Sequence, residues 1–252
     1  MTKRIFTDRS RHTTKLAAGM AMFVLSLGGW PKAGLAQAAT PGSGLKIGIL
    51  GSGNIGGTLG TLWVKNGHPV LFSSRHPEQL KKLAESLGPL ARAGTVREAL
   101  AFGDVVLVAV PYSAYPQIGK DYAAGFKGKI VIDAGNAVPS RDGAIAKEAA
   151  ENGIGVTSAK YLMGARVVRA FNTLNYRTLA NGSHRPGGRI AIPIAGDDKD
   201  ALATVSTLVR SAGFEPVIIG PLVRATDFAR GAALYGQEIT ADEMRRRLKT
   251  LR

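Results

Sequence analysis

A glycine-rich hexapeptide, Gly51-Ser52-Gly53-Asn54-Ile55-Gly56, has the residue types and spacing of a phosphate-binding loop. It directly follows the apolar run Leu45–Leu50 and precedes a segment with helical periodicity. In that context the first glycine permits a tight turn, the second lets a pyrophosphate approach the backbone, and the third lets the helix pack closely on the strand. The N–H groups at the start of the helix favour phosphate charge. The motif therefore predicts a dinucleotide-binding site, and a glycine turn without a ligand is the alternative.

The residues after the next predicted strand distinguish between the two nicotinamide dinucleotides. About 20 residues beyond the glycines, NAD-binding chains place an Asp or Glu against the ribose 2′-hydroxyl. This sequence has Ser73-Ser74-Arg75-His76 there, and no acidic residue before Glu78. Arg75 can stack on the adenine and pair with a 2′-phosphate, to which Ser74 can donate a hydrogen bond. The sequence therefore predicts NADP(H), and an ordinary exposed arginine is the alternative for Arg75 taken alone.

Strands and helices alternate from Leu45 onward, and these elements must position the loop. The predicted strands cover residues 45–50, 69–72, 91–94, 104–110, 129–133, 167–171, 189–194 and 215–219. The predicted helices cover residues 54–66, 77–87, 96–102, 113–123, 198–212 and a C-terminal region. This alternation predicts an α/β fold with a doubly wound, mostly parallel sheet, the Rossmann fold, followed by a small C-terminal α/β extension. Pro193 suggests that its strand lies at an edge of the sheet.

From Leu45 to about Gln237 the sequence resembles the NADP-dependent oxidoreductases that reduce or oxidise the deazaflavin coenzyme F420. Besides the glycine loop, the resemblance rests on Ser74-Arg75, Val110-Pro111, Ala170-Phe171-Asn172-Thr173, Gly196-Asp197-Asp198 and Gly220-Pro221-Leu222. Related dinucleotide domains occur in pyrroline-carboxylate reductases and membrane ferric reductases. The resemblance implies an enzyme, an NADP(H)-dependent oxidoreductase that transfers hydride between the nicotinamide and F420 or a flavin-like acceptor.

The same resemblance implies roles for individual residues. Ser52–Ile55 would wrap the pyrophosphate, and Ser74-Arg75 would contact the 2′-phosphate. Val110-Pro111 and the segment Ala134–Ala137, Ala137 in particular, would border the nicotinamide. A second pocket for the acceptor would be lined by Asn172, which replaces the His of some family members, and by Gly220, Pro221 and Leu222. No catalytic residue is expected, because the cofactor carries the hydride chemistry.

Other polar residues give weaker indications of chemistry. The chain has no cysteine, which excludes disulfides and cysteine–zinc sites. We expect Asp133 to position the Asp133–Asn136 loop, and Asp197 and Asp198 to cap the following helix rather than bind a metal. No metal-ligand spacing occurs among the four histidines, His12, His68, His76 and His184. The sequence therefore predicts no metal site.

The first 38 residues have the organisation of an export signal. Residues 1–15 are basic, Leu16–Trp30 carries no charge, and Ala36-Gln37-Ala38 has the small-x-small pattern of a cleavage site. We predict a signal peptide over 1–38 cleaved after Ala38, a linker over 39–44, an NAD(P)-binding domain with its acceptor-site extension over 45–252, and a periplasmic protein. An uncleaved anchor is the alternative, although the apolar stretch is shorter than the roughly 20 residues of a membrane span.

The net charge of +15 raises nucleic acid as an alternative partner. The dense basic cluster lies at residues 245–252, and we interpret it as a solvated helix face or tail. We therefore expect a small-molecule hydride acceptor as partner, with no nucleic acid and no membrane span after cleavage. Analogy with the family alone suggests a homodimer. A non-catalytic NADP(H)-binding sensor or partner module is the alternative function.

Overall fold

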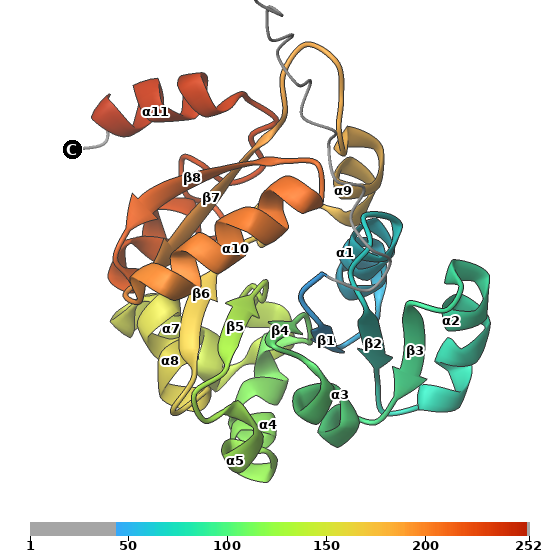
Figure 1. Ribbon diagram of the computed structural model, residues 1–252. Helices are drawn as coiled ribbons and strands as arrows, with labels where there is room; N and C mark the ends of the chain where they lie inside the picture. Colours follow the sequence, from blue (N-terminus) through green and yellow to red (C-terminus); the bar gives the residue numbers. More distant parts are fainter. Residues whose placement is uncertain (1–43, 251–252) are drawn as a thin grey trace, which may run out of the picture. The chain divides into compact units, whose positions relative to one another are not determined.

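A computed structural model describes residues 44–250 (Figure 1), so the predicted signal peptide and almost all of the predicted linker lie outside the described residues. In this part of the chain eight strands form one sheet in the order β3-β2-β1-β4-β5-β6-β7-β8. Every neighbouring pair is parallel except β6 and β7, which are antiparallel. The predicted doubly wound, mostly parallel α/β sheet is therefore confirmed.

The strands lie close to their predicted positions. Their bounds are Ile47–Leu50 for β1, Val70–Ser73 for β2, Ala91–Gly94 for β3, Val105–Val108 for β4, Ile130–Asp133 for β5, Arg166–Arg169 for β6, Ala191–Gly196 for β7 and Glu215–Gly220 for β8. Strands β7 and β8, with the helix between them, form the predicted C-terminal α/β extension of the sheet.

The helices agree with the prediction less completely. Their bounds are Asn54–Lys65 for α1, Lys81–Leu87 for α2, Val96–Phe102 for α3, Tyr115–Asp121 for α4, Ala123–Phe126 for α5, Pro139–Asp142 for α6, Ala144–Asn152 for α7, Ile154–Tyr161 for α8, Tyr176–Gly182 for α9, Lys199–Ser211 for α10 and Ala241–Thr250 for α11. Three short 3₁₀ helices, η1, η2 and η3, cover Pro77–Leu80, Tyr112–Ala114 and Leu222–Phe228. The sequence did not predict α6 to α9, and the predicted helix 77–87 begins as η1.

The core lies on both faces of the sheet. On one face α1 and α10 pack against alternate residues of the strands, and Trp63 of α1 donates its indole N–H to the Leu208 carbonyl of α10 at 2.9 Å. On the other face α3, α7 and α8 cover the remaining strand side chains, and Gly48 of β1 leaves room for the backbone of α3. Because both faces are covered, the central strands are buried along their whole length, which explains their continuous apolar runs.

The predicted edge position of the strand containing Pro193 is wrong, because β7 lies between β6 and β8. Proline is tolerated there because β6 pairs only with Ala195 and Gly196 at the end of β7. The Ile190 carbonyl accepts a hydrogen bond from β8, whereas the Ala191 N–H points the other way, to Ile239. By alternation the nitrogen of Pro193 also faces away from β8, where the ladder with β6 has not yet begun.

Candidate cofactor and acceptor site

The glycine loop joins β1 to α1 by a bend that side chains would block. Gly51 has a φ of +92°, and a Cβ there would lie 2.6 Å from the Ala109 carbonyl oxygen. A Cβ on Gly56 would collide with the carbonyl oxygen of Gly51. A Cβ on Gly53, in contrast, would have no atom within 4 Å, so space is open beside this residue. These are the three roles that the motif assigns to its glycines.

The start of α1 provides an anion site of the kind that a pyrophosphate requires. Gly53 occupies the N-cap and has no side chain to cap the helix, and the first turn of α1 contains no acidic residue. The first backbone N–H groups of a twelve-residue helix are therefore left for a ligand, together with the positive end of its dipole. The backbone of this loop fits the pyrophosphate of NADP(H).

The end of β2 lies against the glycine loop. The Ser73 carbonyl accepts hydrogen bonds from the N–H groups of Gly51 and Ser52, at 3.1 and 3.0 Å, and from the Ser52 hydroxyl at 3.1 Å. Ser74 and Arg75 follow directly, and Arg75 is exposed to solvent. The structure therefore brings the predicted 2′-phosphate residues to the same edge of the sheet as the predicted pyrophosphate loop.

The predicted nicotinamide wall is formed where β4 and β5 end. A Cβ on Gly51 would lie 2.7 Å from Cγ1 of Val110, which places Val110-Pro111 beside the glycine loop. The N–H of Ala134 donates to the Val108 carbonyl at 3.1 Å, so the segment leading to Ala137 begins next to the end of β4. The structure thus gathers all the predicted cofactor-binding residues at the carboxyl ends of β1, β2, β4 and β5.

Asp142 joins the segments after β4 and β5, a role that no sequence motif indicated. Its carboxylate accepts hydrogen bonds from the N–H of Ser113 at 3.0 Å, from the N–H of Val138 at 2.7 Å and from Arg141 at 2.8 Å. Burial opposes ionisation, but the hydrogen bonds from Arg141, Val138 and Ser113 prevail and lower the pKa of Asp142 to about 2. Arg141 also donates to the Asn136 carbonyl at 2.7 Å.

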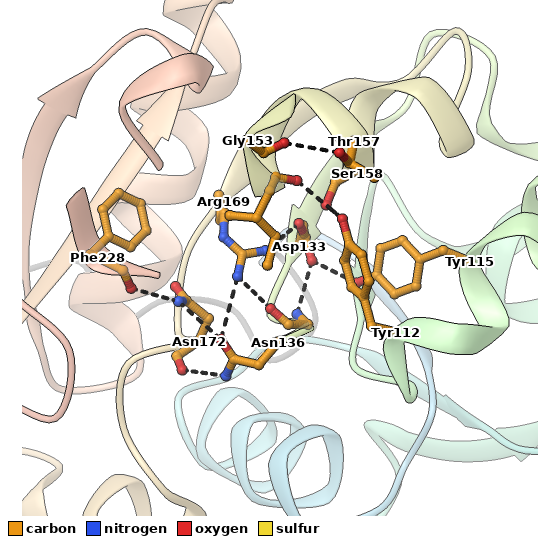
Figure 2. Close-up of polar contacts among 12 residues, drawn as sticks. Tyr112, Tyr115, Asp133, Asn136, Gly153, Thr157, Ser158, Arg169, Asn172 and Phe228 are labelled. Carbon is orange, nitrogen blue, oxygen red and sulfur yellow. Dashed lines mark hydrogen bonds and ion pairs between the residues drawn. The ribbon is translucent and has the colours of Figure 1, made fainter. Parts of the chain in front are cut away.

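A buried ion pair holds the loop after β5 (Figure 2). Arg169 of β6 lies 2.6 Å from Asp133 of β5, and neither side chain is exposed to solvent. Asp133 also accepts hydrogen bonds from the Tyr115 hydroxyl at 2.6 Å and from the Gly135 N–H at 2.9 Å, and Arg169 donates to the Gly135 carbonyl at 2.5 Å. Asp133 therefore positions the Asp133–Asn136 loop, as expected from the sequence.

Two tyrosines close this network on the side of α4 and α8 (Figure 2). The Tyr112 hydroxyl contacts the Ile154 carbonyl at 3.1 Å and the Ser158 hydroxyl at 2.9 Å, and its ring centre lies 4.5 Å from that of Tyr115. Burial, reinforced by the negative charge of Asp133, raises the pKa of both phenols. Both hydroxyls therefore stay protonated at neutral pH and act as structural hydrogen-bonding groups.

Asn172 links three segments of the chain. Its amide donates to the Phe228 carbonyl at 2.9 Å, and its own carbonyl accepts from the Asn136 side chain at 2.7 Å. The side-chain oxygen of Asn172 is buried without a hydrogen-bond partner among the described residues. The preceding Phe171 has a φ of +63°, an unusual conformation for an aromatic residue, which turns the chain out of β6. These contacts are those of a residue that turns the chain at the end of a strand, and direct contact of Asn172 with an acceptor stays a prediction.

A hollow of about 230 Å³ lies next to this network. Its lining is almost entirely small and apolar, and consists of Ala137, Pro139, Ala146, Ala149, Ala150, Ile154, Ala229 and Arg230. Asp133 and Arg169 fix the backbone just before Ala137, and Asn172 fixes Phe228 just before Ala229. Both walls of the hollow are thus attached to one buried polar network.

Gly220, Pro221 and Leu222 do not line this hollow. Gly220 ends β8 opposite Ala195, and the N–H of Leu222 donates to Asp197 at 2.8 Å. The part of the same segment that reaches the hollow comes later, at Ala229 and Arg230. Asp198 caps α10 by accepting from the Ala201 N–H at 2.7 Å, so the capping expectation is confirmed for Asp198 and wrong for Asp197.

The described part of the chain has neither a cluster of metal-binding side chains nor a membrane-spanning helix. Between residues 44 and 250 no group of three or more histidine, aspartate or glutamate side chains is arranged to hold a metal ion. In the same range the structure has no helix with the length and apolar composition of a membrane span. The basic residues of α11 pair with its own acids, as in Arg245–Asp242 at 2.9 Å and Arg246–Glu243 at 2.6 Å.

Residues 46–137, which contain the glycine loop and the nicotinamide wall, match the family described as NADP oxidoreductase, coenzyme F420-dependent. Over this segment the chain is similar to that family of NADP-dependent oxidoreductases. The predicted family resemblance is therefore confirmed for this segment, and the match ends before Arg169 and the second wall of the hollow.

Individual relatives agree with this placement. Over 194 residues, 75% of this chain, the sequence is 33% identical to Metalloreductase STEAP3 of Rattus norvegicus, and the chain spans 37% of the length of that relative. A crystal structure of a hypothetical protein from Sinorhizobium meliloti is 29% identical with a TM-score of 0.66, covering 79% of this chain and 96% of that chain. A crystal structure described as an F420-dependent NADP reductase from Arthrobacter sp. fb24 is 23% identical with a TM-score of 0.61, covering 73% and 88%, which supports the fold.

Proposed function

We propose that this protein transfers hydride between NADP(H) and a flavin-like or deazaflavin acceptor that occupies the alanine-lined hollow. The observation that carries the proposal is that Ala137 belongs both to the predicted nicotinamide wall and to the lining of the hollow. An acceptor in the hollow would therefore lie beside the reacting end of the cofactor. The small side chains of Ala146, Ala149 and Ala150 leave room for a flat ring on this wall.

The residues of the chain bind, orient and shield. The α1 amides and the open face at Gly53 would hold the pyrophosphate, and Arg75 with Ser74 would hold the 2′-phosphate. When bound, NADPH supplies the hydride from its nicotinamide ring. The loop fixed by Asp133 and Arg169 orients the ring wall, and the apolar lining excludes water from the hollow. Holding two reactants in contact can lower the activation barrier by roughly 7–11 kcal/mol in favourable cases.

Calorimetry on the purified chain tests the cofactor end of this proposal. We expect tighter binding of NADP⁺ than of NAD⁺, and Arg75→Ala should weaken NADP⁺ binding roughly ten- to hundredfold while leaving NAD⁺ binding unchanged. Lys82→Ala on the exposed side of α2 removes the same charge and serves as the matched control. Equal affinities of the unsubstituted chain for the two nucleotides would contradict the assignment.

Acceptor reduction tests the hydride-transfer end. We expect the absorbance of reduced nicotinamide to fall when NADPH is mixed with the protein and FMN, FAD or F420. Tight NADPH binding without oxidation by any of these acceptors would refute the enzyme and support the sensor or partner module instead.

The N-terminal 38 residues lead to a separate proposal, that the chain is exported and cleaved after Ala38. Their basic start, uncharged stretch and Ala36-Gln37-Ala38 pattern support it. Mass spectrometry of the protein from the periplasmic fraction should find a chain beginning at Ala39. A full-length chain confined to the cytoplasm would contradict it.

A further inference from the structure

We propose, resting on the function proposed above, that the hollow selects acceptors that carry a phosphate beside their flat ring, and that Arg230 is the residue that makes this selection. Arg230 is the single charged side chain that lines the hollow. Its place in the otherwise apolar lining is therefore the place where an anionic group of a bound molecule would be recognised.

The rest of the lining recognises shape and not polarity. Five alanines, a proline and an isoleucine offer neither hydrogen-bond donors nor acceptors from their side chains. Such a surface accepts a flat apolar ring but cannot distinguish a ring that carries a phosphate chain from one that does not. That distinction requires a charged group in the lining, and Arg230 is the charged side chain there.

Among the described residues the guanidinium of Arg230 has no acidic partner, in contrast to Arg224 and Arg141. Arg224 pairs with Asp227, the nearest acidic residue along the chain, and Arg141 is engaged with Asp142 and the Asn136 carbonyl. Arg230 forms no ion pair with any of the residues that the structure describes, and it is exposed. A bound phosphate would therefore meet an uncompensated positive charge.

The backbone that carries Arg230 is held firmly. Phe228, two residues earlier, accepts the hydrogen bond from the buried Asn172 (Figure 2), and the Ala229 N–H donates to the Thr226 carbonyl at 3.2 Å. Through Asn172 and Asn136 this anchor connects to the opposite wall at Ala137. The position of the backbone that carries Arg230, relative to the ring site, is thus fixed before the acceptor arrives, which lowers the cost of binding.

A pair of acceptors with the same ring separates charge recognition from ring recognition. FMN and riboflavin differ by one phosphate, so Michaelis constants for both are measured with saturating NADPH in the unsubstituted protein and in Arg230→Gln. We expect a lower KM for FMN than for riboflavin in the unsubstituted protein. Arg230→Gln should raise the KM for FMN about tenfold, the size expected of one charge-assisted hydrogen bond, and leave both the KM for riboflavin and kcat unchanged.

A matched control and a salt series complete the test. Lys147→Gln, on the exposed side of α7 but outside the lining, removes the same charge and should change neither KM. Added salt should raise the KM for FMN in the unsubstituted protein and leave it unchanged in Arg230→Gln. Equal KM values for the two acceptors, or equal effects of Arg230→Gln on both, would overturn the selection by Arg230.

Failure of the proposed function gives a different result. If NADPH binds but neither acceptor is reduced, hydride transfer is refuted. The dissociation constants of FMN and riboflavin, measured by quenching of their fluorescence on binding, then test the selection by Arg230 without turnover. The same two variants are used, and the same ratio is expected for the dissociation constants. Binding of neither flavin overturns the selection as well.

Discussion

Replacing Arg169 by methionine should be among the most destabilising single changes in the sheet. The side chains of Arg169 and Asp133 are both without solvent exposure and lie 2.6 Å apart. After Arg169→Met, Asp133 keeps its hydrogen bonds from Tyr115 and Gly135 but loses the only cation beside it in the buried network. Removing one partner of a buried pair typically costs about 3–5 kcal/mol. A domain has about 5–15 kcal/mol in total, so roughly a fifth or more of the stability is at stake.

Urea denaturation followed by circular dichroism measures this loss as a change in the free energy of unfolding. Arg166→Met on the same strand is the matched control, because Arg166 is 41% exposed and lies 3.8 Å from Asp198. An exposed pair of this kind contributes at most about 1 kcal/mol. We therefore expect Arg169→Met to shift the urea midpoint strongly and Arg166→Met to shift it slightly.

A double-mutant cycle shows whether charge, rather than packing, causes the loss. Asp133→Asn combined with Arg169→Met removes both buried charges and leaves a neutral acceptor for the Gly135 N–H. The combined variant should be more stable than the sum of the two single losses predicts, by about 1–3 kcal/mol. The reasoning is refuted if Arg169→Met costs no more than Arg166→Met, or if the two losses add without coupling.

Three further predictions concern other positions. Asp142→Asn should lower the free energy of unfolding by about 1–3 kcal/mol. Because the pKa of Asp142 is lowered to about 2, the stability that its charge contributes is present above the ordinary value of 3.8 and is lost as the pH falls toward 2. Thermal melts in acid measure this loss. Burial lowers the pKa of His68, so the unfolded chain binds a proton at a higher pH than the folded chain does. Stability should therefore fall as the pH drops below 6.5, and His68→Gln should make stability depend less on pH in this range. Gly56→Ala should weaken NADP⁺ binding at least roughly tenfold in calorimetry because its Cβ meets the Gly51 carbonyl, whereas Gly57→Ala, whose Cβ would lie 3.5 Å from the nearest atom, should leave it almost unchanged.

The cofactor half of the site could be predicted from the sequence because its signals are local. The glycine loop carries the three conformational requirements within six consecutive residues, and the strand before it is a buried apolar run. Ser74-Arg75 could be placed beside it because the carboxyl ends of parallel strands meet at one edge of a sheet. Chain order along a Rossmann sheet was therefore enough to assemble this half.

For the acceptor half the sequence predicted Asn172 and Gly220–Leu222 from the family resemblance alone. Apart from Ala137, the residues that line the hollow were missed, because the contacts that bring them together join segments far apart in the chain. Asp142 meets Ser113, 29 residues earlier, and Asn172 meets Phe228, 56 residues later. Helix α7 was missed as well, because its buried side is mostly alanine and gives a weak periodic signal. One usable signal was present: Arg169 is the one charge within the predicted strand 167–171, and Asp133 ends the neighbouring strand. A charge inside a strand that is covered on both faces requires a buried partner.

This division between local and long-range contacts makes the two halves separable by experiment. Changes in the glycine loop act on backbone amides that we propose contact the cofactor, so they should alter the dissociation constant of NADP(H). Changes in the network of Asp133, Arg169 and Asn172 move the walls at Ala137 and Ala229, so they should alter the rate of hydride transfer and the choice of acceptor more than cofactor affinity. A variant such as Tyr115→Phe, which removes one hydroxyl from Asp133 and keeps the ring, should therefore lower kcat with little change in NADP⁺ binding. An equal loss in both quantities would show that the two halves of the site are coupled through the loop after β5.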